Sequence, residues 1–429
     1  MIRIMKLGSV PNEQIFARTD TSRDVAATVK TIIEDVKKRG DKALFEYTAK
    51  FDGAVLTSLE VSPEEFEEAW LECGAEFTGI LEGAAENIRL FHSLQKREGF
   101  KTVNAQGAVV GQKIVPVEKA GLYVPGGTAA YPSTVLMDSI PAKIAGCEEV
   151  IIVTPPGRNG KVPAAILAAA KIAGVDRVFK IGGAQAIAAM AFGTETVPKT
   201  DKIVGPGNAF VAEAKRQVFG AVSIDMIAGP SEILIVADGK SRASWVAADM
   251  LSQAEHDRMA SAVLVTDSEE LAEAVSLELE RQIPLLERAD IARASIDSNG
   301  KIIVAADIWE AVSVANEIAP EHLELSVDDP YTYLAKVKNA GSVFLGRYCP
   351  EALGDYFAGP NHTLPTGGTA RFSSALSVDD FVKKIQFIEY DEKSLAKCAA
   401  KVNEFAKKEG LTGHGRSVMI RAEESGAVE

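Results

Sequence analysis

Hydrophobic residues recur along the first part of the chain at two spacings, which predict helices followed by a strand. Apolar positions follow a helical period over residues 25–36, and Gly40 ends this predicted helix. Residues 62–96 begin with Ser-Pro-Glu-Glu, a strong helix start, and keep the helical period with a break near Gly74. Residues 109–117 have the pattern of a strand.

From residue 121 onward, short apolar strands alternate with helices. The predicted strands are residues 121–124, 150–153, 177–181, 202–204, 233–236, 262–265, 301–304, 322–325 and 342–345, and the predicted helices are residues 163–173, 186–192, 209–219, 244–256, 269–282 and 308–318. This alternation predicts parallel sheets flanked by helices with right-handed crossovers. After Arg371 the pattern becomes helical only, so we expect this tail to pack on another body or another subunit.

The predicted fold is α/β, with two Rossmann-like parallel-sheet domains and a small helical C-terminal tail. We expect an N-terminal extension over residues 1–20 that packs with the tail, a first α/β domain over residues 21–120 and 238–372, a second α/β domain over residues 121–237, and the helical tail over residues 373–429. The second domain contains the glycine-rich turns.

Charge and cysteine content narrow the class of protein. Lys and Arg number 46 against 60 Asp and Glu, a net charge of -14, which disfavours a general nucleic-acid or membrane-surface binder. The four cysteines are scattered without a CxxC, which disfavours a disulfide framework or zinc ribbon and indicates a reducing compartment. The first twenty residues are too polar for a signal peptide, and no apolar run reaches the length of a membrane span. We therefore expect a cytoplasmic protein.

Three glycine-rich turns follow predicted strands: Gly126-Gly127, Gly182-Gly183-Ala184-Gln185 and Gly205-Pro206-Gly207-Asn208. Glycine lets backbone N–H groups approach a phosphate, and ligands gather at the carboxyl ends of parallel strands. One such turn satisfies the ordinary needs of an α/β fold, but three in one domain favour a nucleotide or another small ligand. The GxGxxG fingerprint is absent because Phe210 occupies the third glycine position.

An acid and a histidine stand side by side in Ala319-Pro320-Glu321-His322, between a predicted helix and an apolar strand. The chain has only five histidines, and a histidine beside a carboxylate suits proton transfer near neutral pH. We predict that Glu321 and His322 form an acid–base pair. The alternative is an ordinary acid at a strand start beside a half-buried histidine.

Gln253 and His256 lie three residues apart near the end of a predicted helix, so their side chains share one face. Two ligands at this spacing could hold one metal ion, but an amide–histidine pair is more often joined by a plain hydrogen bond. The residues alone leave both readings open.

Residues 354–368 form a turn-rich stretch without clear secondary structure. Long irregular loops in compact domains are usually functional or disordered. This one contains an acid, aromatic residues and a histidine, which favours function. Asp355 is a candidate hard metal ligand or a turn cap. His414, at the start of the last helix, and Ser231, before a strand, are equally compatible with structural roles.

Cys147 is a candidate nucleophile that we set aside. It lies at a helix end and is followed by Glu148 and Glu149; the helix end and these acids raise the pKa of a thiol and disfavour the thiolate. We predict a packing role.

Taken together, these stretches resemble the histidinol dehydrogenase family in order and over nearly the whole chain. The motifs are Gly121-Leu122-Tyr123-Val124-Pro125-Gly126-Gly127, Gly182-Gly183-Ala184-Gln185, Gly205-Pro206-Gly207-Asn208, Ala228-Gly229-Pro230-Ser231-Glu232, Ser252-Gln253-Ala254-Glu255-His256, Pro320-Glu321-His322-Leu323 and Gly359-Pro360-Asn361-His362. The resemblance implies an aldehyde-dehydrogenase-like fold. It also implies a zinc enzyme that oxidises L-histidinol to L-histidine through histidinaldehyde with two NAD, the last step of histidine biosynthesis.

The resemblance also implies roles for individual residues. The zinc ligands would be Gln253, His256, Asp355 and His414; the substrate contacts would be these four with Ser231, His322, His362 and Glu409; and the NAD contacts would be Tyr123, Gln185 and Asn208. The family forms a homodimer with exchanged tails, so Glu409 and His414 would reach the partner's site. His322 would accept the hydroxyl proton, and Glu321 would deprotonate the water that hydrates the aldehyde.

Three other functions remain open from the residues. One is a zinc hydrolase that uses Glu321 as the base for water, with purely structural glycine turns. Another is a dehydrogenase of a different amino alcohol. The third is a non-catalytic binding protein built from two α/β lobes.

Overall fold

The computed structural model describes residues 1–17, 25–126 and 130–425, which form two compact units. The first comprises Met1–Gln95 and Glu118–Phe381, and the second comprises Lys96–Val117 and Val382–Glu429. Gly127, part of one predicted glycine turn, and residues 18–20 of the predicted extension lie outside the described residues. No helix of the described ranges combines the length and apolar character needed to cross a bilayer.

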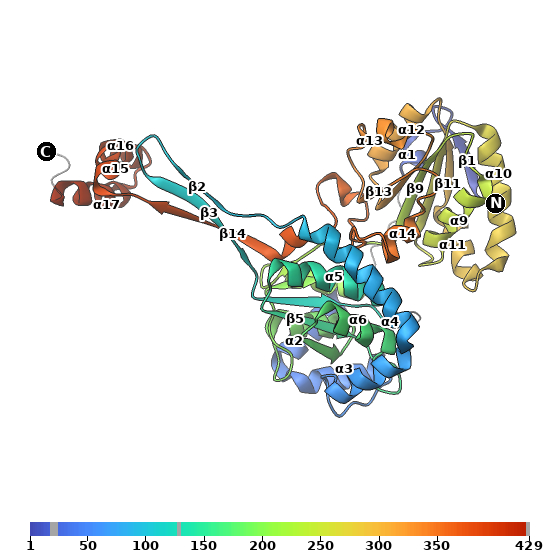
Figure 1. Ribbon diagram of the computed structural model, residues 1–429, viewed down its shortest axis with the longest axis horizontal. Coiled ribbons are helices and arrows are strands. Elements are labelled where there is room, and N and C mark those ends of the chain that lie inside the picture. Colours follow the sequence, from blue (N-terminus) through green and yellow to red (C-terminus); the bar gives the residue numbers. More distant parts are fainter. Residues whose placement is uncertain (18–24, 127–129, 426–429) are drawn as a thin grey trace. The chain divides into compact units, whose positions relative to one another are not determined.

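The first unit contains two parallel sheets (Figure 1). The six-stranded sheet has the order β1 (Arg3–Lys6), β11 (Lys301–Val304), β10 (Ser261–Thr266), β9 (Glu232–Ala237), β12 (His322–Ser326) and β13 (Ser342–Leu345). Its central strands are apolar on both faces because helices cover both sides. Ile233 and Ile235 pack against one set of helices, and Leu234 and Val236 pack against the other.

Helices of different size cover the two faces of this sheet. One face packs against α9 (Ala243–Ala254), α10 (Glu269–Gln282) and α11 (Ala289–Asn299), and the other against α1 (Asn12–Ile15), α12 (Ile308–Ile318) and α13 (Pro330–Leu334). The short helix α14 (Glu351–Tyr356) and the 3-10 helices η1 (Ile283–Leu285) and η2 (Thr369–Arg371) complete this lobe.

The five-stranded sheet has the order β6 (Arg177–Lys180), β5 (Glu149–Thr154), β4 (Lys119–Tyr123), β7 (Lys202–Val204) and β8 (Ser223–Ile224). One face packs against α2 (Ala26–Arg39), α3 (Asp41–Phe51), α7 (Gly183–Phe192) and α8 (Ala209–Val218), and the other helices are α4 (Pro63–Ser93), α5 (Pro132–Ala145), α6 (Ala164–Ala173) and η3 (Val378–Phe381). A capping box at Ser62 and Glu65 starts α4, and Gly74, with φ 70°, breaks its helical geometry as the sequence predicted.

The strand order of this second lobe places its ligand-binding edge. The chain proceeds from β4 outward to β5 and β6, then returns to β7 on the other side of β4. The carboxyl ends of β4 and β7 therefore flank the point where the strand order reverses, the usual ligand position in open α/β sheets. The turns at Gly126 and at Gly205-Pro206-Gly207-Asn208 lie at this point, whereas Gly182-Gly183 follows the edge strand β6.

The second unit is a β-ribbon that leads to three helices (Figure 1). Its antiparallel strands are β2 (Phe100–Val103), β3 (Val109–Pro116) and β14 (Val382–Glu389), in the order β14-β3-β2, and its helices are α15 (Glu392–Ala396), α16 (Ala399–Lys408) and α17 (Thr412–Glu424). The expectation of a tail made only of helices was wrong at β14. Its eight residues pair with β3 through register contacts such as Ile385 with Lys113, which no local pattern reveals.

The α/β fold with two parallel sheets is confirmed, but the chain is divided between them differently from the prediction. Helices α2 and α3 belong to the five-stranded lobe, since Val29, Ile32 and Leu44 share a core with Phe179 of β6, and α4 packs against α5 and α6 of the same lobe. We expected residues 26–93 to share a domain with residues 238–372, and this expectation was wrong. The described N-terminal strand Arg3–Lys6 pairs with Lys301–Val304, rather than packing with the tail.

Candidate active site

A cavity of about 980 Å³ in the first unit is lined by most of the residues that the sequence singled out. These are Ser231, Gln253, His256, Glu321, His322, Asp355 and His362, together with Gly126, Gly205, Pro206, Gly207 and Asn208 from the glycine turns. Residues spread over more than 230 positions of the sequence are thus brought together in one cavity that contains carboxylates, imidazoles, an amide and glycine turns.

The backbone before His322 has an unusual conformation that places the predicted acid–base pair. Ala319 ends α12 with φ 52°, and it is the only described non-glycine residue with positive φ. A left-handed residue here ends the helix, and Pro320 prevents the helix from continuing. Glu321 then precedes the first residue of β12, His322, and both side chains are buried.

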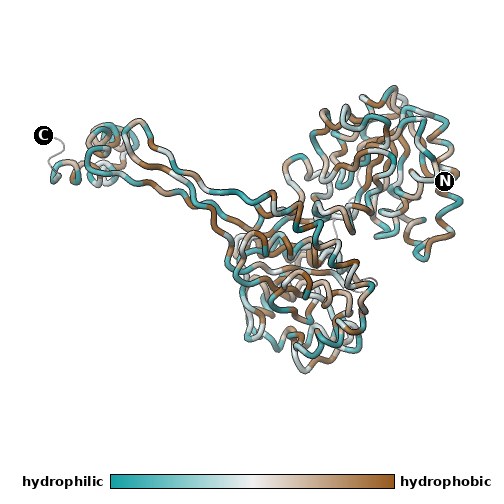
Figure 2. Tube along the Cα trace, viewed as in Figure 1, coloured by the Kyte–Doolittle hydropathy of each residue, from teal (hydrophilic) through white to brown (hydrophobic). Residues whose placement is uncertain are grey.

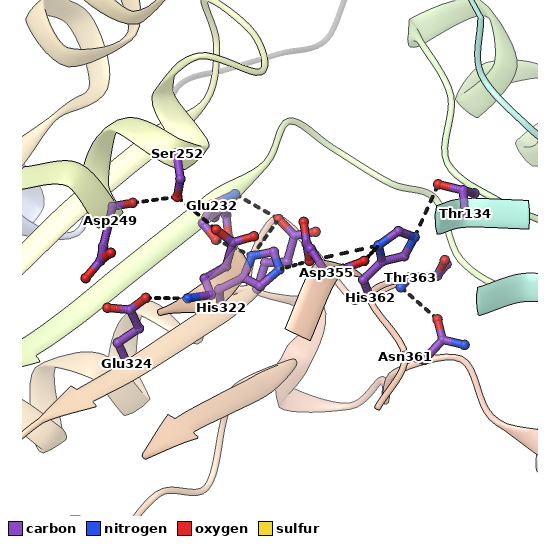
Figure 3. Close-up of polar contacts among 12 residues, drawn as sticks. Thr134, Glu232, Asp249, Ser252, His322, Glu324, Asp355, Asn361, His362 and Thr363 are labelled. Carbon is purple, nitrogen blue, oxygen red and sulfur yellow. Dashed lines mark hydrogen bonds and ion pairs between the residues drawn. The ribbon is translucent and has the colours of Figure 1, made fainter. Parts of the chain in front are cut away.

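His322 is held through its ring nitrogens (Figure 3). Its Nδ1 lies 3.0 Å from the carbonyl oxygen of Glu232, which requires an N–H at that nitrogen. Its Nε2 is buried without a hydrogen-bond partner among the described residues and lies 3.6 Å from Asp355 Oδ1. In the neutral ring Nε2 is therefore the nitrogen available to take up a proton.

Glu321 stands on the other side of the same imidazole. Its Oε2 accepts a hydrogen bond from the Glu232 N–H at 2.8 Å and lies 3.6 Å from His322 Nδ1. Burial raises the pKa of Glu321 to about 8, although His322 opposes the shift. Burial lowers the pKa of His322, but the charges of Glu321 and Asp355 outweigh it and raise this pKa to about 10.

Asp355 and His362 form the next contacts along the cavity wall (Figure 3). His362 Nδ1 lies 3.1 Å from the Asp355 carbonyl oxygen, and its Nε2 lies 3.2 Å from the hydroxyl of Thr134 on α5. Burial raises the pKa of Asp355, but the nearby imidazoles of His322 and His362 hold it well below its usual range. Asp355 lies on the helix α14, and not in the irregular loop that the sequence suggested.

Gln253 and His256 lie at the end of α9, as the sequence predicted. The helix stops at Ala254, and the His256 N–H donates to the Gln253 carbonyl at 3.1 Å, so His256 continues the chain in a turn beyond the helix. Both amide atoms of Gln253, which is 1% exposed, are buried without a partner among the described residues. A plain hydrogen-bonded pair with His256 would have satisfied one of them, so the structure favours the reading in which a ligand does so.

Three carboxylates beside this site, the buried Glu351 and Glu324 and the half-buried Asp249, were missed from the sequence. The Ser252 hydroxyl donates to Glu351 Oε2 at 2.8 Å, and the Glu351 N–H donates to Glu324 Oε1 at 2.8 Å. Burial raises the pKa of Glu351 to about 7 and that of Asp249 to about 6. The spacing of Glu351 and Asp355, four residues apart and hence on one helix face, was the available signal.

Within the described residues, one group has the geometry of a metal site. Ligand atoms of His322, Glu351 and Asp355 all lie within 4.8 Å of one another. Of the predicted ligands only Asp355 belongs to this group, while Gln253 and His256 line the same cavity. The donor set of the cavity, imidazole, carboxylate and an unpartnered amide oxygen, is suited to a divalent cation.

The predicted NAD-contact residues occupy two kinds of position. Asn208 lines the cavity, and its side-chain oxygen accepts hydrogen bonds from the Phe210 and Val211 N–H groups at the start of α8. Tyr123 and Gln185 are buried, and the Tyr123 hydroxyl accepts the Gly183 N–H at 3.1 Å. Their visible role is to shape the turn after β6.

The remaining candidates lie elsewhere. Ser231, half-buried in the cavity wall, precedes β9. Glu409 and His414 are exposed residues of the second unit, after α16 and in the first turn of α17. Cys147 is buried, and burial is the main reason that its pKa is raised to about 12, so its packing role is confirmed.

Comparison with known proteins identifies the family. Residues 16–422 match the family model for histidinol dehydrogenase. The chain belongs to the histidinol dehydrogenase family. It is therefore a member of a family of oxidoreductases, and the resemblance found in the sequence motifs is confirmed.

Histidinol dehydrogenases from several bacteria match over nearly their whole length. The chain is 53% identical to the histidinol dehydrogenase of Listeria monocytogenes serotype 4b over 406 residues, covering 95% of each chain. It is 50% identical to that of Clostridium acetobutylicum over 426 residues, covering 98% of this chain and 99% of the relative. The crystal structure of the Elizabethkingia anophelis histidinol dehydrogenase is 38% identical, covers 99% of both chains and superposes with a TM-score of 0.94.

Proposed function

We propose that the protein oxidises L-histidinol to L-histidine through histidinaldehyde with two NAD and one zinc ion per subunit, as the last step of histidine biosynthesis. The observation that supports this most directly is the meeting of Glu321, His322 and Asp355 with the unpartnered amide of Gln253 in one cavity. A family of histidinol dehydrogenases supplies the substrate class.

The residues fit a zinc ion. Gln253, His256 and Asp355 from the first unit would hold it, with His414 supplied by the tail of a partner subunit. The buried Gln253 amide supports this, because an unsatisfied polar group costs about 1–3 kcal/mol that coordination of its oxygen would offset. A cation here would supply a site for the imidazole and amine of the substrate and would counter the negative charge that raises the pKa of His322.

His322 and Glu321 have separate tasks in this reaction. Alcohol oxidation sends a hydride to the nicotinamide and a proton to a base, and His322 Nε2 is the candidate because its Nδ1 is committed to the Glu232 carbonyl. The aldehyde must then be hydrated, and Glu321 takes the proton of the attacking water. The hydrate loses its second hydride to a fresh NAD, and His322 again receives the hydroxyl proton. Ser231 and His362 are the further substrate contacts.

NAD would bind against the five-stranded lobe. The turns at Gly126 and Gly205-Pro206-Gly207-Asn208 flank the reversal of strand order and line the cavity. Asn208 would contact the dinucleotide directly. Tyr123 and Gln185 would contact it from the turn that they shape after β6.

The second unit is proposed to exchange between two subunits of a homodimer. Its ribbon has exposed apolar side chains: Phe100 and Val103 on β2, and Ile385, Phe387 and Ile388 on β14. Figure 2 shows hydrophobic and hydrophilic stretches following one another along the chain in this ribbon. Ile388 is 70% exposed and Phe100 60%, and exposed large apolar side chains gathered on one short ribbon support an interaction surface. A partner subunit would cover it, and Glu409 and His414 would complete the partner's site.

Four unpaired cysteines agree with a reducing cytoplasm.

The test is a zinc-loaded protein mixed with L-histidinol and NAD. We expect two NADH for each histidine formed and a loss of activity on chelation that zinc restores. A panel of other amino alcohols separates a histidinol dehydrogenase from a dehydrogenase of related substrates. No change in nicotinamide absorbance with any of them would refute the dehydrogenase function and leave hydrolysis by Glu321 as the alternative.

A further inference from the structure

A lysine and an aspartate form a buried ion pair in the five-stranded lobe, and the aspartate belongs to the wall of the cavity. Lys215 lies on α8, and Asp225 follows β8. The Lys215 Nζ contacts the Asp225 carboxylate, and the two side chains are 2% and 1% exposed. Neither residue is part of the proposed zinc or acid–base chemistry.

Each member of the pair also binds one backbone group of Gly205. The Lys215 ammonium donates to the Gly205 carbonyl oxygen at 3.0 Å, and the Gly205 N–H donates to Asp225 Oδ2 at 2.8 Å. The two side chains therefore hold the peptide groups on both sides of the Gly205 Cα atom.

Gly205 is the position where the chain leaves β7 and enters the Gly205-Pro206-Gly207-Asn208 turn. Its φ is +110°, and a Cβ built there would lie 2.2 Å from the Tyr123 carbonyl oxygen. Glycine is required by this conformation and approach, but it has the most backbone freedom to lose. Charge-assisted hydrogen bonds at both of its peptide groups restrict that freedom before any ligand binds.

Stability alone does not account for the pair. Desolvation of a buried ion pair largely cancels its Coulomb attraction, and apolar replacements of similar volume are often neutral or stabilising. A restrained binding loop, in contrast, gains affinity because less ordering remains to be done on association. The turn that this pair restrains lines the cavity at the point where strand order reverses.

We propose that Lys215 and Asp225 are positioning residues that hold the Gly205-Pro206-Gly207-Asn208 turn in the conformation that binds the dinucleotide. The inference rests on the proposed use of NAD at this turn. The new element is that part of the affinity for NAD is assigned to a buried ion pair, of which Asp225 also reaches the cavity wall.

The test replaces the pair by apolar residues of similar size, Lys215→Met with Asp225→Leu, so that neither charge is left alone. The matched control is Lys180→Met with Glu65→Gln. Lys180 is another strongly buried lysine of this lobe with a carboxylate partner, 3.0 Å from Glu65, and it does not line the cavity. Steady-state kinetics give kcat and the KM for NAD and for histidinol; NADH fluorescence gives its Kd, and zinc content and Tm are measured alongside.

For the Lys215/Asp225 variant we expect the KM for NAD and the Kd for NADH to rise about tenfold or more, equal to about 1.4 kcal/mol. The KM for histidinol and the zinc content should stay within about twofold of wild type. The Lys180/Glu65 variant should change Tm only. A folded Lys215/Asp225 variant with wild-type affinity for both nucleotides would overturn the inference, as would an equal rise in both KM values.

Two further outcomes are decided by additional measurements. If the double variant does not fold, the single variant Asp225→Asn is used, because it keeps an oxygen for the Gly205 N–H. A selective rise in its KM for NAD supports the inference. An unchanged KM for NAD overturns it. If the wild-type protein forms no NADH from histidinol, the proposed function fails, and NADH binding still tests the two side chains directly.

Discussion

Asp138 is a buried carboxylate whose protonation should make the stability of the first unit depend on pH. It lies on α5 and is fully buried; its Oδ1 accepts the Thr363 hydroxyl at 2.6 Å, and its Oδ2 has no partner among the described residues. Burial raises its pKa to about 7; Thr363 and Lys215 oppose the shift, and Asp225 adds to it. The perturbation is Asp138→Asn, which keeps the acceptor for Thr363 and removes the titration.

The size and sign of the effect follow from linkage. An unfolded aspartate titrates near about 3.9, whereas folded Asp138 titrates at about 7. Between these pH values the folded protein binds a proton that the unfolded chain does not, so stability falls by about 1.4 kcal/mol for each unit of rising pH. From pH 5 to pH 8 the loss attributable to Asp138 is about 2.6 kcal/mol.

The assay is urea unfolding of wild type and Asp138→Asn at pH 5 and pH 8, with the free energy of unfolding obtained by linear extrapolation. Other buried carboxylates titrate in both proteins, so the difference between the two isolates Asp138. We expect the wild type to lose about 2–3 kcal/mol relative to the variant between the two pH values. Equal differences at pH 5 and pH 8 would refute the reasoning.

Thr363→Val is the matched control for this experiment. It keeps the Asp138 carboxyl but removes the hydroxyl that favours its charged form, so the pKa of Asp138 should rise further. The dependence on pH should persist and shift toward higher pH. A flat profile in this variant would show that Asp138 is not the group responsible.

Three further predictions concern the site. His322→Asn should lower kcat by about 10²–10⁴-fold with zinc content little changed, checked by NADH formation and metal analysis, and a loss of zinc instead would assign His322 to the metal. Glu321→Gln, which can still accept the Glu232 N–H, should slow oxidation of histidinaldehyde more than oxidation of histidinol, and equal slowing would contradict its role on water. Mixing and reassociating His322→Asn with His414→Asn protein should restore about one quarter of wild-type activity, because half of the random dimers have one intact site. Activity equal to the average of the two parents would exclude shared sites.

Local pattern was sufficient to predict most strands and helices, but not which sheet each helix covers. The helical period of Val29, Ile32 and Leu44 fixes an apolar stripe that suits either sheet, and only the shared core with Phe179 decides between them. Strand β14 was misread because the apolar residues of 382–388 also fit a helix, and its partner β3 lies about 270 positions earlier. Pairing over such a distance leaves no trace in one sequence.

The meeting of Glu321 and His322 in one cavity was easier to predict from the sequence than the residues that support them. Glu321 and His322 are neighbours in sequence, so their meeting required only that the strand begin where it does. Glu351 and Ser252 meet across about 100 positions, and neither is unusual in its local context. The contact between these two residues depends on how α9 and α14 pack together. The raised pKa of Glu351 in turn follows from its burial there.

The five-stranded sheet faces the cavity with the carboxyl ends of its strands, and the six-stranded sheet faces it with the amino ends. The usual rule, that ligands lie at the carboxyl ends of parallel strands, holds for only the first of these sheets. The five-stranded sheet follows the rule with its turns after β4 and β7. In the six-stranded sheet the equivalent position, after β9 and β12, is occupied by ion pairs of Arg347 with Asp238 and Asp328.

The six-stranded sheet instead contributes the amino ends of those strands, where Glu232 and His322 begin β9 and β12. A strand start presents a backbone N–H that needs an acceptor, and that of Glu232 is bound by the Glu321 carboxylate at 2.8 Å. The Glu232 carbonyl in turn fixes His322 Nδ1 at 3.0 Å. One residue at the start of β9 therefore orients both members of the predicted acid–base pair. This explains how an adjacent acid and histidine can point into one cavity, although side chains of successive strand residues normally point to opposite faces.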